Sequence, residues 1–359
     1  MSEIALTENA VRASLAGFQD PETGRSITQL GQVHQLKLDA GRLAVTLGLT
    51  SWSAPLWEET RLELENRLKG GFLAATPTVT VAEHHRPAEK MGEVALAAKS
   101  VIAVGSGKGG VGKSSVALFL AAALSRAGCK IGLLDADVYG PSIPHLLGTN
   151  ERPQLLDNRI APIEVAGMKV MSIGLLVPPS EAVIWRGPML HGALTQFLRD
   201  TAWGELDYLI VDMPPGTGDV ALSLSQLVPL AGAVVVSTPQ DVALLDATKA
   251  ITMFRKVNIE VLGMVENMSF FVCPHCGNRE DIFGSGGAKR RAAELHVPFL
   301  GEVPMWKQLR LLADEGRLVA ALDYAPAKPY LEGLAHALVG NLAAQRRQSP
   351  RLPTLPIIG

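Results

Sequence analysis

The chain has 359 residues, 47% hydrophobic and 19% charged, an ordinary globular composition with room for one large domain and a small one. Its net charge of −2 and pI near 6.5 give no general reason to expect a nucleic-acid or membrane partner. No apolar run reaches the roughly 18 residues of a membrane span, no signal peptide is visible, and three cysteines argue against a disulfide framework, so we expect a cytoplasmic protein.

Residues 1–83 are expected to form a small α+β domain, because short alternating strands are mixed with segments of helical spacing. Its expected elements are helices at 11–18 and 56–68 and strands at 33–38, 43–49 and 78–81. The first two strands are joined by a short turn and should form a hairpin. His34, His84 and His85 are interpreted as solvated surface histidines rather than metal ligands.

Residues 84–98 include a proline and have no clear period, so they are interpreted as a linker. Residues 99–345 alternate apolar strands with helices, which predicts an α/β domain with a mostly parallel sheet covered by helices on both faces. Strands are expected at 101–104, 130–134, 208–211, 233–236, 261–265 and 299–301, and helices at 116–124, 189–200, 220–227, 242–255, 287–295 and 329–344. The proline-containing tail 346–359 should be loosely ordered.

A glycine-rich segment lies between the expected strand at 101–104 and the helix that follows it. Residues 107–114 of this segment fit the phosphate-binding pattern G-x-x-x-x-G-K-[ST]. Glycines let backbone N–H groups surround phosphate oxygens, and the helix N-terminus adds its positive end. Lys113 should reach the β- and γ-phosphates, and Ser114 should offer one Mg²⁺ ligand. The candidate nucleotide-binding residues are Gly107, Lys108, Gly109, Gly110, Val111, Gly112, Lys113, Ser114 and Ser115.

Carboxylates follow two of the expected strands, where an open α/β sheet places its ligands. Asp212 fits the strand-end aspartate that helps to hold Mg²⁺ opposite a P-loop. Asp137 is the better candidate for orienting or deprotonating the attacking water, with Asp135 nearer the metal. The glycines and prolines after Asp212 suit a segment that moves when the γ-phosphate leaves. Asp219 is expected to cap the next helix.

Asn267 follows another strand, and its amide could read the adenine edge or could serve as a turn or cap residue. Cys273 and Cys276 are spaced to grip one metal on a tight turn, but two thiolates are half of a four-ligand site. Cys129 should be a small buried residue and does not complete the set. A symmetric dimer would supply four thiolates, for a [4Fe–4S] cluster or a structural zinc, and the spacing alone leaves both open. A redox dithiol is less favoured, because this pair does not open a helix after a strand.

These motifs resemble the Mrp/ApbC family of iron–sulfur cluster carriers, within the MinD/ParA-type ATPases. The resemblance covers roughly residues 99–340. It rests on the lysine-bearing P-loop and on the segments 135–142, 212–219, 265–269 and 273–277. The small domain is similar to one that recurs in iron–sulfur assembly proteins, through Asp20-Pro21-Glu22, Ser26-Ile27, Leu30-Gly31 and the Leu-Thr ahead of Pro55. Ala54 stands where that family often has a cysteine, which puts a cysteine-dependent role of the domain in doubt.

The resemblance implies an ATP-hydrolysing homodimer that holds a [4Fe–4S] cluster on Cys273 and Cys276 of both subunits. Apo iron–sulfur proteins and cluster scaffold proteins are its implied partners, with no nucleic acid and no membrane. Lys108 matches the lysine that crosses to the partner's nucleotide in this class. The implied catalytic residues are Lys108, Lys113, Asp137 and Asp212, and the implied cofactors are ATP, Mg²⁺ and the cluster.

A positioning or partitioning ATPase of the MinD/ParA kind, without a cluster, is the alternative function. Such a switch needs an amphipathic membrane helix or a basic face, whereas residues 345–353 are broken by prolines. It also leaves the cysteine pair without a role. A further alternative keeps the dimer and places structural zinc at the cysteines.

Overall fold

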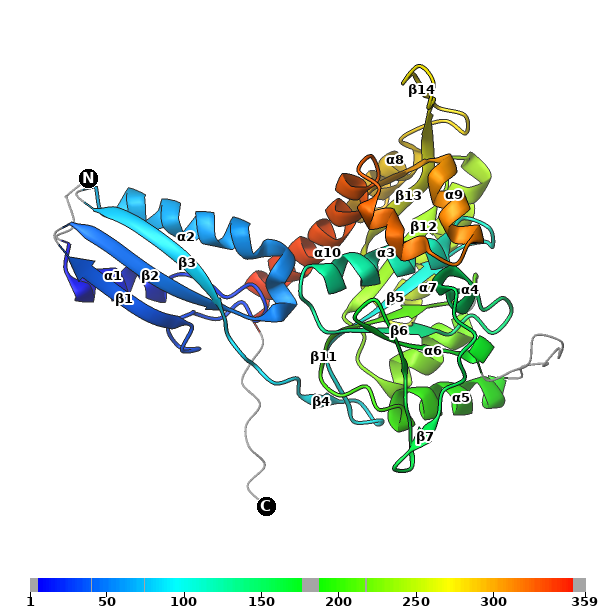
Figure 1. Ribbon diagram of the computed structural model, residues 1–359, viewed down its shortest axis with the longest axis horizontal. Coiled ribbons are helices and arrows are strands. Elements are labelled where there is room, and N and C mark those ends of the chain that lie inside the picture. Colours follow the sequence, from blue (N-terminus) through cyan, green and yellow to red (C-terminus); the bar gives the residue numbers. More distant parts are fainter. Residues whose placement is uncertain (1–5, 40, 74, 176–186, 217, 351–359) are drawn as a thin grey trace. The chain divides into compact units, whose positions relative to one another are not determined.

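The computed structural model describes residues 6–39, 41–73, 75–175, 187–216 and 218–350. The chain divides into two compact units. The small unit comprises the N-terminal residues up to Arg86 together with the C-terminal residues from Val339, and the large unit spans Pro87–Leu338. Figure 1 draws the sheet of the small unit in blue to cyan and the large unit mainly in green to orange. Within the described ranges, no helix has both the length and the apolar character needed to cross a membrane.

The small unit is built on a three-stranded sheet. Its elements are α1 Glu8–Ala16, β1 Val33–Asp39, β2 Arg42–Leu49, the 3-10 helix η1 Ser51–Leu56, α2 Trp57–Gly71 and β3 Thr76–Glu83. β2 lies in the middle, antiparallel to β1 and parallel to β3, which confirms the expected hairpin. Every second residue of β2 is buried with apolar residues of α1 and α2, so both helices cover one face: Leu43, Val45, Leu47 and Leu49 pack with Val11, Leu15, Leu64 and Leu68.

The large unit is an α/β sheet whose central strands are parallel, as expected. Its sheet runs in the order β14-β13-β12-β5-β11-β6-β10-β9, and β15 also pairs with β13. The strands are β5 Leu96–Ser106, β6 Ile131–Asp135, β9 Ile163–Val165, β10 Met168–Ser172, β11 Leu206–Asp212, β12 Gly232–Ser237, β13 Val261–Val272, β14 Arg279–Glu280 and β15 Phe299–Met305. The parallel strands β6, β11, β5 and β12 are neighbours, so their carboxyl ends meet at one edge.

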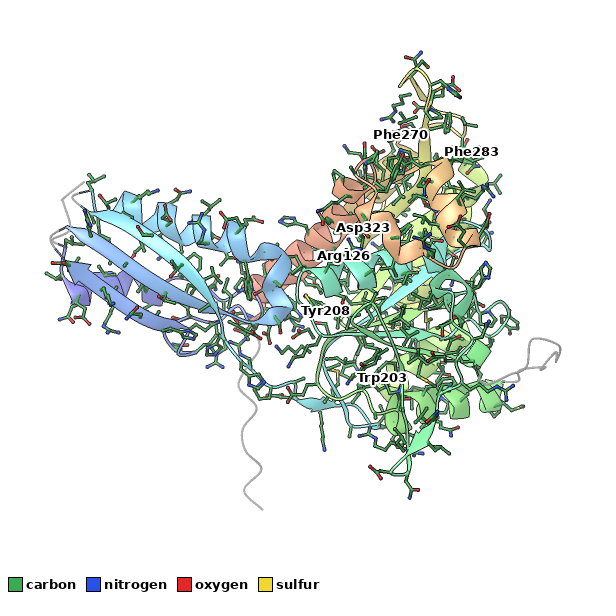
Figure 2. The ribbon with its side chains drawn as sticks, viewed as in Figure 1. Arg126, Trp203, Tyr208, Phe270, Phe283 and Asp323 are labelled. Atoms are coloured by element: carbon green, nitrogen blue, oxygen red, sulfur yellow. The ribbon has the colours of Figure 1, made fainter. Side chains whose placement is uncertain are left out.

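Helices cover both faces of this sheet, which confirms the predicted architecture. The helices are α3 Lys113–Arg126, α4 Ile143–Leu147, α5 Gly187–Asp200, α6 Gly218–Leu227, α7 Asp241–Lys256, α8 Gly287–Glu294, α9 Lys307–Asp314, the 3-10 helices η2 Ile173–Leu175 and η3 Leu318–Asp323, and α10 Lys328–Gln348. Apolar residues of α5 to α8 share one core with alternate strand residues, and α3 packs on β5, β6 and β11 from the other face. Arg126 joins α3 to η3 through two hydrogen bonds to Asp323, at 2.6 and 2.8 Å (Figure 2).

The expected linker at 84–98 is wrong in its second half. A two-residue strand, β4 Lys90–Met91, pairs antiparallel with the beginning of β5. β5 therefore begins at Leu96, five residues before the predicted strand, and Leu96 and Ala98 are already buried. Gly92 forms the turn with a φ of 66°, and a Cβ there would collide with the backbone carbonyl of Leu227.

Other differences from the predicted elements lie at the edge of the sheet and at the C-terminus. The sheet is extended beyond β6 by the β9–β10 hairpin, which the sequence pattern did not indicate because its strands are only three and five residues long. Two further short strands, β7 Leu155–Leu156 and β8 Arg159–Ile160, pair with each other. α10 continues to Gln348, so the first residues of the expected tail are helical. Residues 351–359 of that tail lie outside the described residues.

Candidate functional site

The glycine-rich segment forms the turn between β5 and α3, as predicted. Gly107 follows the last residue of β5, and a Cβ there would collide with the backbone of Asp246 in α7. Gly112 precedes α3 with a φ of 81°, and a Cβ there would collide with the amide of Asn267. Glycine is thus required at both positions by close approach, and at Gly112 also by its backbone conformation.

A cavity of about 280 Å³ lies between this loop and the segments that follow β6 and β11. It is lined by Ser106, Lys108, Gly109, Gly110, Gly112, Lys113, Ser114, Ser115, Asp137, Gly140, Ser142, Leu146 and Pro215. The cavity therefore opens where the carboxyl ends of three neighbouring parallel strands meet, the usual position of a ligand in such a sheet. Lys108 lines the cavity as a half-buried side chain, and no ion pair to it is seen within the described residues.

Lys113 connects the loop to both predicted carboxylates. Its Nζ lies 2.5 Å from Oδ1 of Asp212 and 3.4 Å from Oδ2 of Asp137, and it donates to Oγ of Ser114 at 3.2 Å. All three charged side chains are more than nine-tenths buried. Charges in such a poorly solvated site interact more strongly than on the surface, so this lysine is fixed in position by its partners.

Asp135 and Asp137 have different surroundings although they are two residues apart. Asp135 accepts hydrogen bonds from the backbone N–H groups of Asp137 and Ile143, both at 3.1 Å, and from Oγ of Ser172 at 3.0 Å. Asp137 accepts from the backbone N–H groups of Tyr139 and Gly140 at 3.3 Å with Oδ1, while its Oδ2 faces Lys113. Asp135 therefore fixes the loop after β6 through its hydrogen bonds, whereas Asp137 lines the cavity.

The environment of Asp212 suits a magnesium ion. Its Oδ2 is buried and accepts no hydrogen bond from the part of the chain that the structure describes. Burial raises the pKa of Asp212, and the nearby Lys113 and the hydroxyl of Ser114 act in the opposite direction. A free carboxylate oxygen beside a hydroxyl is the kind of hard oxygen donor set that Mg²⁺ binds, so Ser114 and Asp212 fit this ion.

The segment after β11 is tied to the P-loop strand by its backbone. The N–H of Met213 donates to the carbonyl of Val104, and that of Gly216 to the carbonyl of Ser106, both at 3.0 Å. Thr217, in the segment predicted to move, lies outside the described residues. Asp219 lies within the first turn of α6 rather than before it, because the helix begins one residue earlier than the predicted cap. A carboxylate in the first turn still stabilises the helix, because its negative charge interacts with the positive end of the helix dipole.

Asn267 lies behind the P-loop. Its Nδ2 donates to the carbonyl of Val111 at 2.9 Å, and the side chain is not among those that line the cavity. The preceding residue, Glu266, is fully buried and accepts from the backbone N–H groups of Gly286 and Ala288 at the start of α8, at 2.9 and 2.7 Å. Sequence reasoning missed this capping role, since the helix that Glu266 caps begins 21 residues later.

Cys273 and Cys276 lie in the turn that joins β13 to β14, at the projecting tip of the large unit (Figure 1). The N–H of Cys273 donates to the carbonyl of Asn278, and the N–H of Gly277 to the carbonyl of Cys273, both at 2.9 Å. Backbone N–H groups of Cys276 and His275, together with the Cys276 thiol, lower the pKa of Cys273. Cys273 is half-buried and Cys276 exposed, so both thiols are available for ligand binding.

One chain supplies only part of a metal site at this tip. Within the described residues, no group of three or more histidine, cysteine, aspartate or glutamate side chains is arranged to hold a metal. Cys129 is buried, as predicted. Phe270, labelled in Figure 2, lies where the hairpin joins the body of the unit. The guanidinium of Arg279 is 3.7 Å from the centre of its ring, and Phe270 packs edge-to-face on Tyr330. These contacts brace the hairpin, and no motif in the sequence indicated them.

Comparisons with known proteins cover both units. A family model described as NUBPL iron-transfer P-loop NTPase matches residues 97–339, and one described as iron-sulfur cluster assembly protein matches residues 8–81. The iron-sulfur cluster carrier protein of Deinococcus radiodurans is 44% identical over 354 residues, covering 98% of this chain and 99% of that protein. The protein of the same description from Escherichia coli K12 is 45% identical over 316 residues, covering 85% of this chain and 84% of its own.

Among solved structures, a nucleotide-binding protein from Archaeoglobus fulgidus in complex with ADP is similar to this chain. The two are 44% identical with a TM-score of 0.55, and the match covers 62% of this chain and 88% of that one. That protein binds ADP, in agreement with the P-loop geometry of this chain.

Proposed function

This chain belongs to the NUBPL iron-transfer P-loop NTPase family and is related along nearly its whole length to iron–sulfur cluster carriers, and we therefore propose that it carries a [4Fe–4S] cluster to apo-proteins in a cycle driven by ATP hydrolysis. The observation that carries the proposal is the combination, in one unit, of a complete P-loop site with two thiols at an exposed hairpin tip. The cluster is the cargo of this cycle rather than a resident cofactor.

In the proposed hydrolysis, water attacks the γ-phosphorus of ATP, the bond to the β,γ-bridging oxygen breaks, and ADP and phosphate result. Asp137 orients the water and accepts its proton, because its carboxylate lines the cavity beside Lys113. Lys113 offsets the charge that develops on the phosphate oxygens. Ser114 and Asp212 would hold Mg²⁺, which neutralises phosphate charge when it is bound.

The structure supports a different division of roles for the aspartates than the sequence suggested. Both oxygens of Asp135 are engaged with the loop after β6, so we assign Asp135 to positioning Asp137 rather than to the metal. The free oxygen of Asp212 makes it the metal ligand. For Asn267, we propose bracing of the P-loop through the carbonyl of Val111 in place of adenine recognition.

For the cargo, we propose that two copies of the chain pair so that Cys273 and Cys276 of each supply four thiolates. The lowered pKa of Cys273 favours the thiolate form that binds iron. In this dimer Lys108 would reach the nucleotide of the partner, as the family resemblance implies, and its half-buried side chain is held by no ion pair among the described residues. Apo iron–sulfur proteins would receive the cluster.

The test is anaerobic reconstitution of the full chain with iron and sulfide, followed by metal analysis and absorption spectroscopy. We expect iron and sulfide in the wild type and in the control variant Cys129→Ala, and neither in Cys273→Ala/Cys276→Ala. Equal iron in the double variant would overturn the proposal. Zinc in place of iron, in protein purified without oxygen, would instead support a structural zinc site.

A further inference from the structure

We propose that His34 and His84 of the small unit form a binding site for a divalent first-row transition metal ion, separate from the cysteine pair and beyond the function proposed above. The sequence suggested two unrelated surface histidines. The structure brings their rings together across 50 positions of the chain, with Nε2 of His34 at 3.0 Å from Nδ1 of His84. The ring centroids are 5.3 Å apart and the rings are tilted by 38°.

A β-bulge directs the side chain of His34 toward this position. In the pairing of β1 with β2, Val33 lies opposite Leu47 and Gln35 lies opposite Thr46, so His34 is the extra residue between two paired positions. Such an inserted residue bends the strand locally and re-aims its side chain. The imidazole consequently lies over the neighbouring strand instead of standing beside its own.

Gly48 provides the space that the ring of His34 occupies. A Cβ at this position of β2 would collide with three atoms of the imidazole, including Nε2. Gly48 does not have the left-handed backbone conformation that demands glycine, so the requirement here is space alone. On the other side of β2, the N–H of His84 donates to the carbonyl of Leu49 at 2.9 Å, which continues the pairing of β3 and fixes His84.

The spacing of the two nitrogens suits one metal ion. Two imidazoles bound to the same ion at about 2.0–2.1 Å, in adjacent coordination positions, hold their nitrogens about 2.9–3.4 Å apart. The two rings now share one proton in a hydrogen bond. An ion that replaces this proton lies to one side of the line between the nitrogens, so each ring turns until its lone pair points at the ion. Imidazole nitrogen selects zinc, copper, nickel and iron ions over magnesium and calcium.

The site is an open one. The described residues offer no third histidine, cysteine, aspartate or glutamate to complete a closed coordination sphere. Water therefore fills the remaining positions, as in sites from which an ion exchanges, unlike the four-ligand closure of structural zinc sites. His34 is exposed and His84 half-buried, so an ion can reach both nitrogens from solvent.

Charged groups of both signs lie next to His84. Arg86, two residues beyond it, pairs with Asp20 at 2.9 Å and with Glu22 at 3.2 Å. Both carboxylates are buried and share this one guanidinium. The positive charge of Arg86 is thus offset by the two side chains with which it pairs.

The experiment titrates Co²⁺ and Zn²⁺ into the full chain carrying Cys273→Ser/Cys276→Ser, which removes the thiol site. Visible absorption of Co²⁺ and calorimetry of Zn²⁺ should report one ion per chain. Loss of a residue that only hydrogen-bonds to a metal ligand already weakens metal binding about ten- to a hundredfold. His34 and His84 are the proposed ligands themselves, so His34→Gln and His84→Gln should each weaken metal binding at least tenfold. Gly48→Ala should do the same without removing a ligand, because it displaces the ring of His34.

Two matched variants are the controls. His85→Gln removes the adjacent exposed histidine, and Gly70→Ala adds a methyl group where space is open, so both should bind like the parent. If folding of a variant is impaired, broadening of the His34 and His84 ring signals by Ni²⁺ in the NMR spectrum of the parent provides the same information. The proposal would be overturned if His34→Gln and His84→Gln bound metal as well as the parent does. Metal binding weakened as much by His85→Gln, or Ni²⁺ broadening confined to other histidines, would overturn it too.

Discussion

At the scale of single residues, the phosphate site depends on Lys113. Lys113→Ala removes the cation that pairs with Asp212 and Asp137 and that would meet the transferred phosphoryl group. Loss of one preorganised electrostatic group costs about a hundred- to a thousandfold in rate, so we expect at least a hundredfold fall in the rate of ATP hydrolysis. A phosphate-release assay measures it.

Lys108→Ala is the informative companion of that variant. Because Lys108 is proposed to act in the partner's site, nucleotide binding by the single chain should be unchanged while hydrolysis falls. Titration with a fluorescent ATP analogue separates the two effects. If Lys108→Ala weakens nucleotide binding as strongly as Lys113→Ala, Lys108 acts within its own chain and the proposed crossing is wrong.

Asp135 should make stability depend on pH. Burial and the neighbouring charge of Asp212 raise the pKa of Asp135 from 3.8 to about 7. The folded state therefore holds a proton that the unfolded state has released between these two values, and the contribution of Asp135 to stability falls as the pH rises through this window. The asparagine of Asp135→Asn cannot titrate. The variant should therefore be less stable than wild type by a larger free energy of unfolding at pH 5 than at pH 7.5.

Thermal unfolding of the nucleotide-free protein across this range measures the difference. The exposed Asp157→Asn serves as the control, and its unfolding temperature should follow that of wild type at every pH. If the difference in unfolding temperature between Asp135→Asn and wild type stays constant from pH 5 to pH 7.5, Asp135 is ionised throughout this range.

At the scale of secondary-structure elements, β13 links the two parts of the proposed site. Asn267 braces the P-loop from this strand, and Cys273 follows its last residue. Between them Met268 has a φ of 55°, and the pairing with β15 shifts register from Asn267 to Phe271. A shift of the P-loop would therefore act, through the hydrogen bond of Asn267, on the strand that carries the cysteine hairpin, which connects nucleotide binding to the proposed cargo site.

Asn267→Asp tests the brace with almost no change of shape. The variant replaces the N–H donor by a carboxylate oxygen, which leaves the carbonyl of Val111 without its hydrogen bond. Loss of the hydrogen bond alone, about 0.5–1.5 kcal/mol, corresponds to about two- to twelvefold weaker nucleotide binding, and repulsion between the new carboxylate and bound phosphates weakens it further. Calorimetry with ADP measures it, and Asn278→Asp in the cysteine turn is a control outside the loop. Unchanged affinity would show that Asn267 does not support the P-loop.

The elements that sequence could predict were those with a local signature. The P-loop and the strand-end aspartates follow contiguous motifs, so their places at the carboxyl ends of β5, β6 and β11 were correct. The contact of Asn267 with Val111 joins residues 156 positions apart, and nothing local marks it. The pairing of His34 with His84 depends on a bulge and on a missing side chain in the strand between them, which only the folded sheet reveals.

At the scale of the whole molecule, the last helix belongs to both compact units. α10 begins in the large unit, and its residues from Val339 cluster with the small one. There Arg347 pairs with Glu63 at 2.9 Å, and the backbone of Arg346 lies against Gly24, where a Cβ would collide with it. The small unit is therefore completed by residues far from it in sequence.

Removal of residues 339–359 should consequently destabilise the small unit more than the large one. The deletion takes away the buried Val339 and Leu342, each contributing about 1.5–3 kcal/mol of apolar burial. We expect the small unit to unfold at a lower temperature in calorimetry, while ADP binding by the large unit persists. If the deletion abolishes ADP binding as well as lowering the stability of the small unit, both units need the C-terminal part of α10. A deletion of residues 351–359 alone is the control.

The two-thiol tip of the large unit has a consequence for how the cargo is kept. If each chain contributes half of the ligands, the loaded species forms from two chains, and its amount rises with the square of their concentration while pairing is weak. Dilution alone would then shed the cluster, with no competing acceptor present. The cellular copy number of the protein would thereby set how long a cluster stays on it, and a recipient could gain access simply by capturing one chain of the pair.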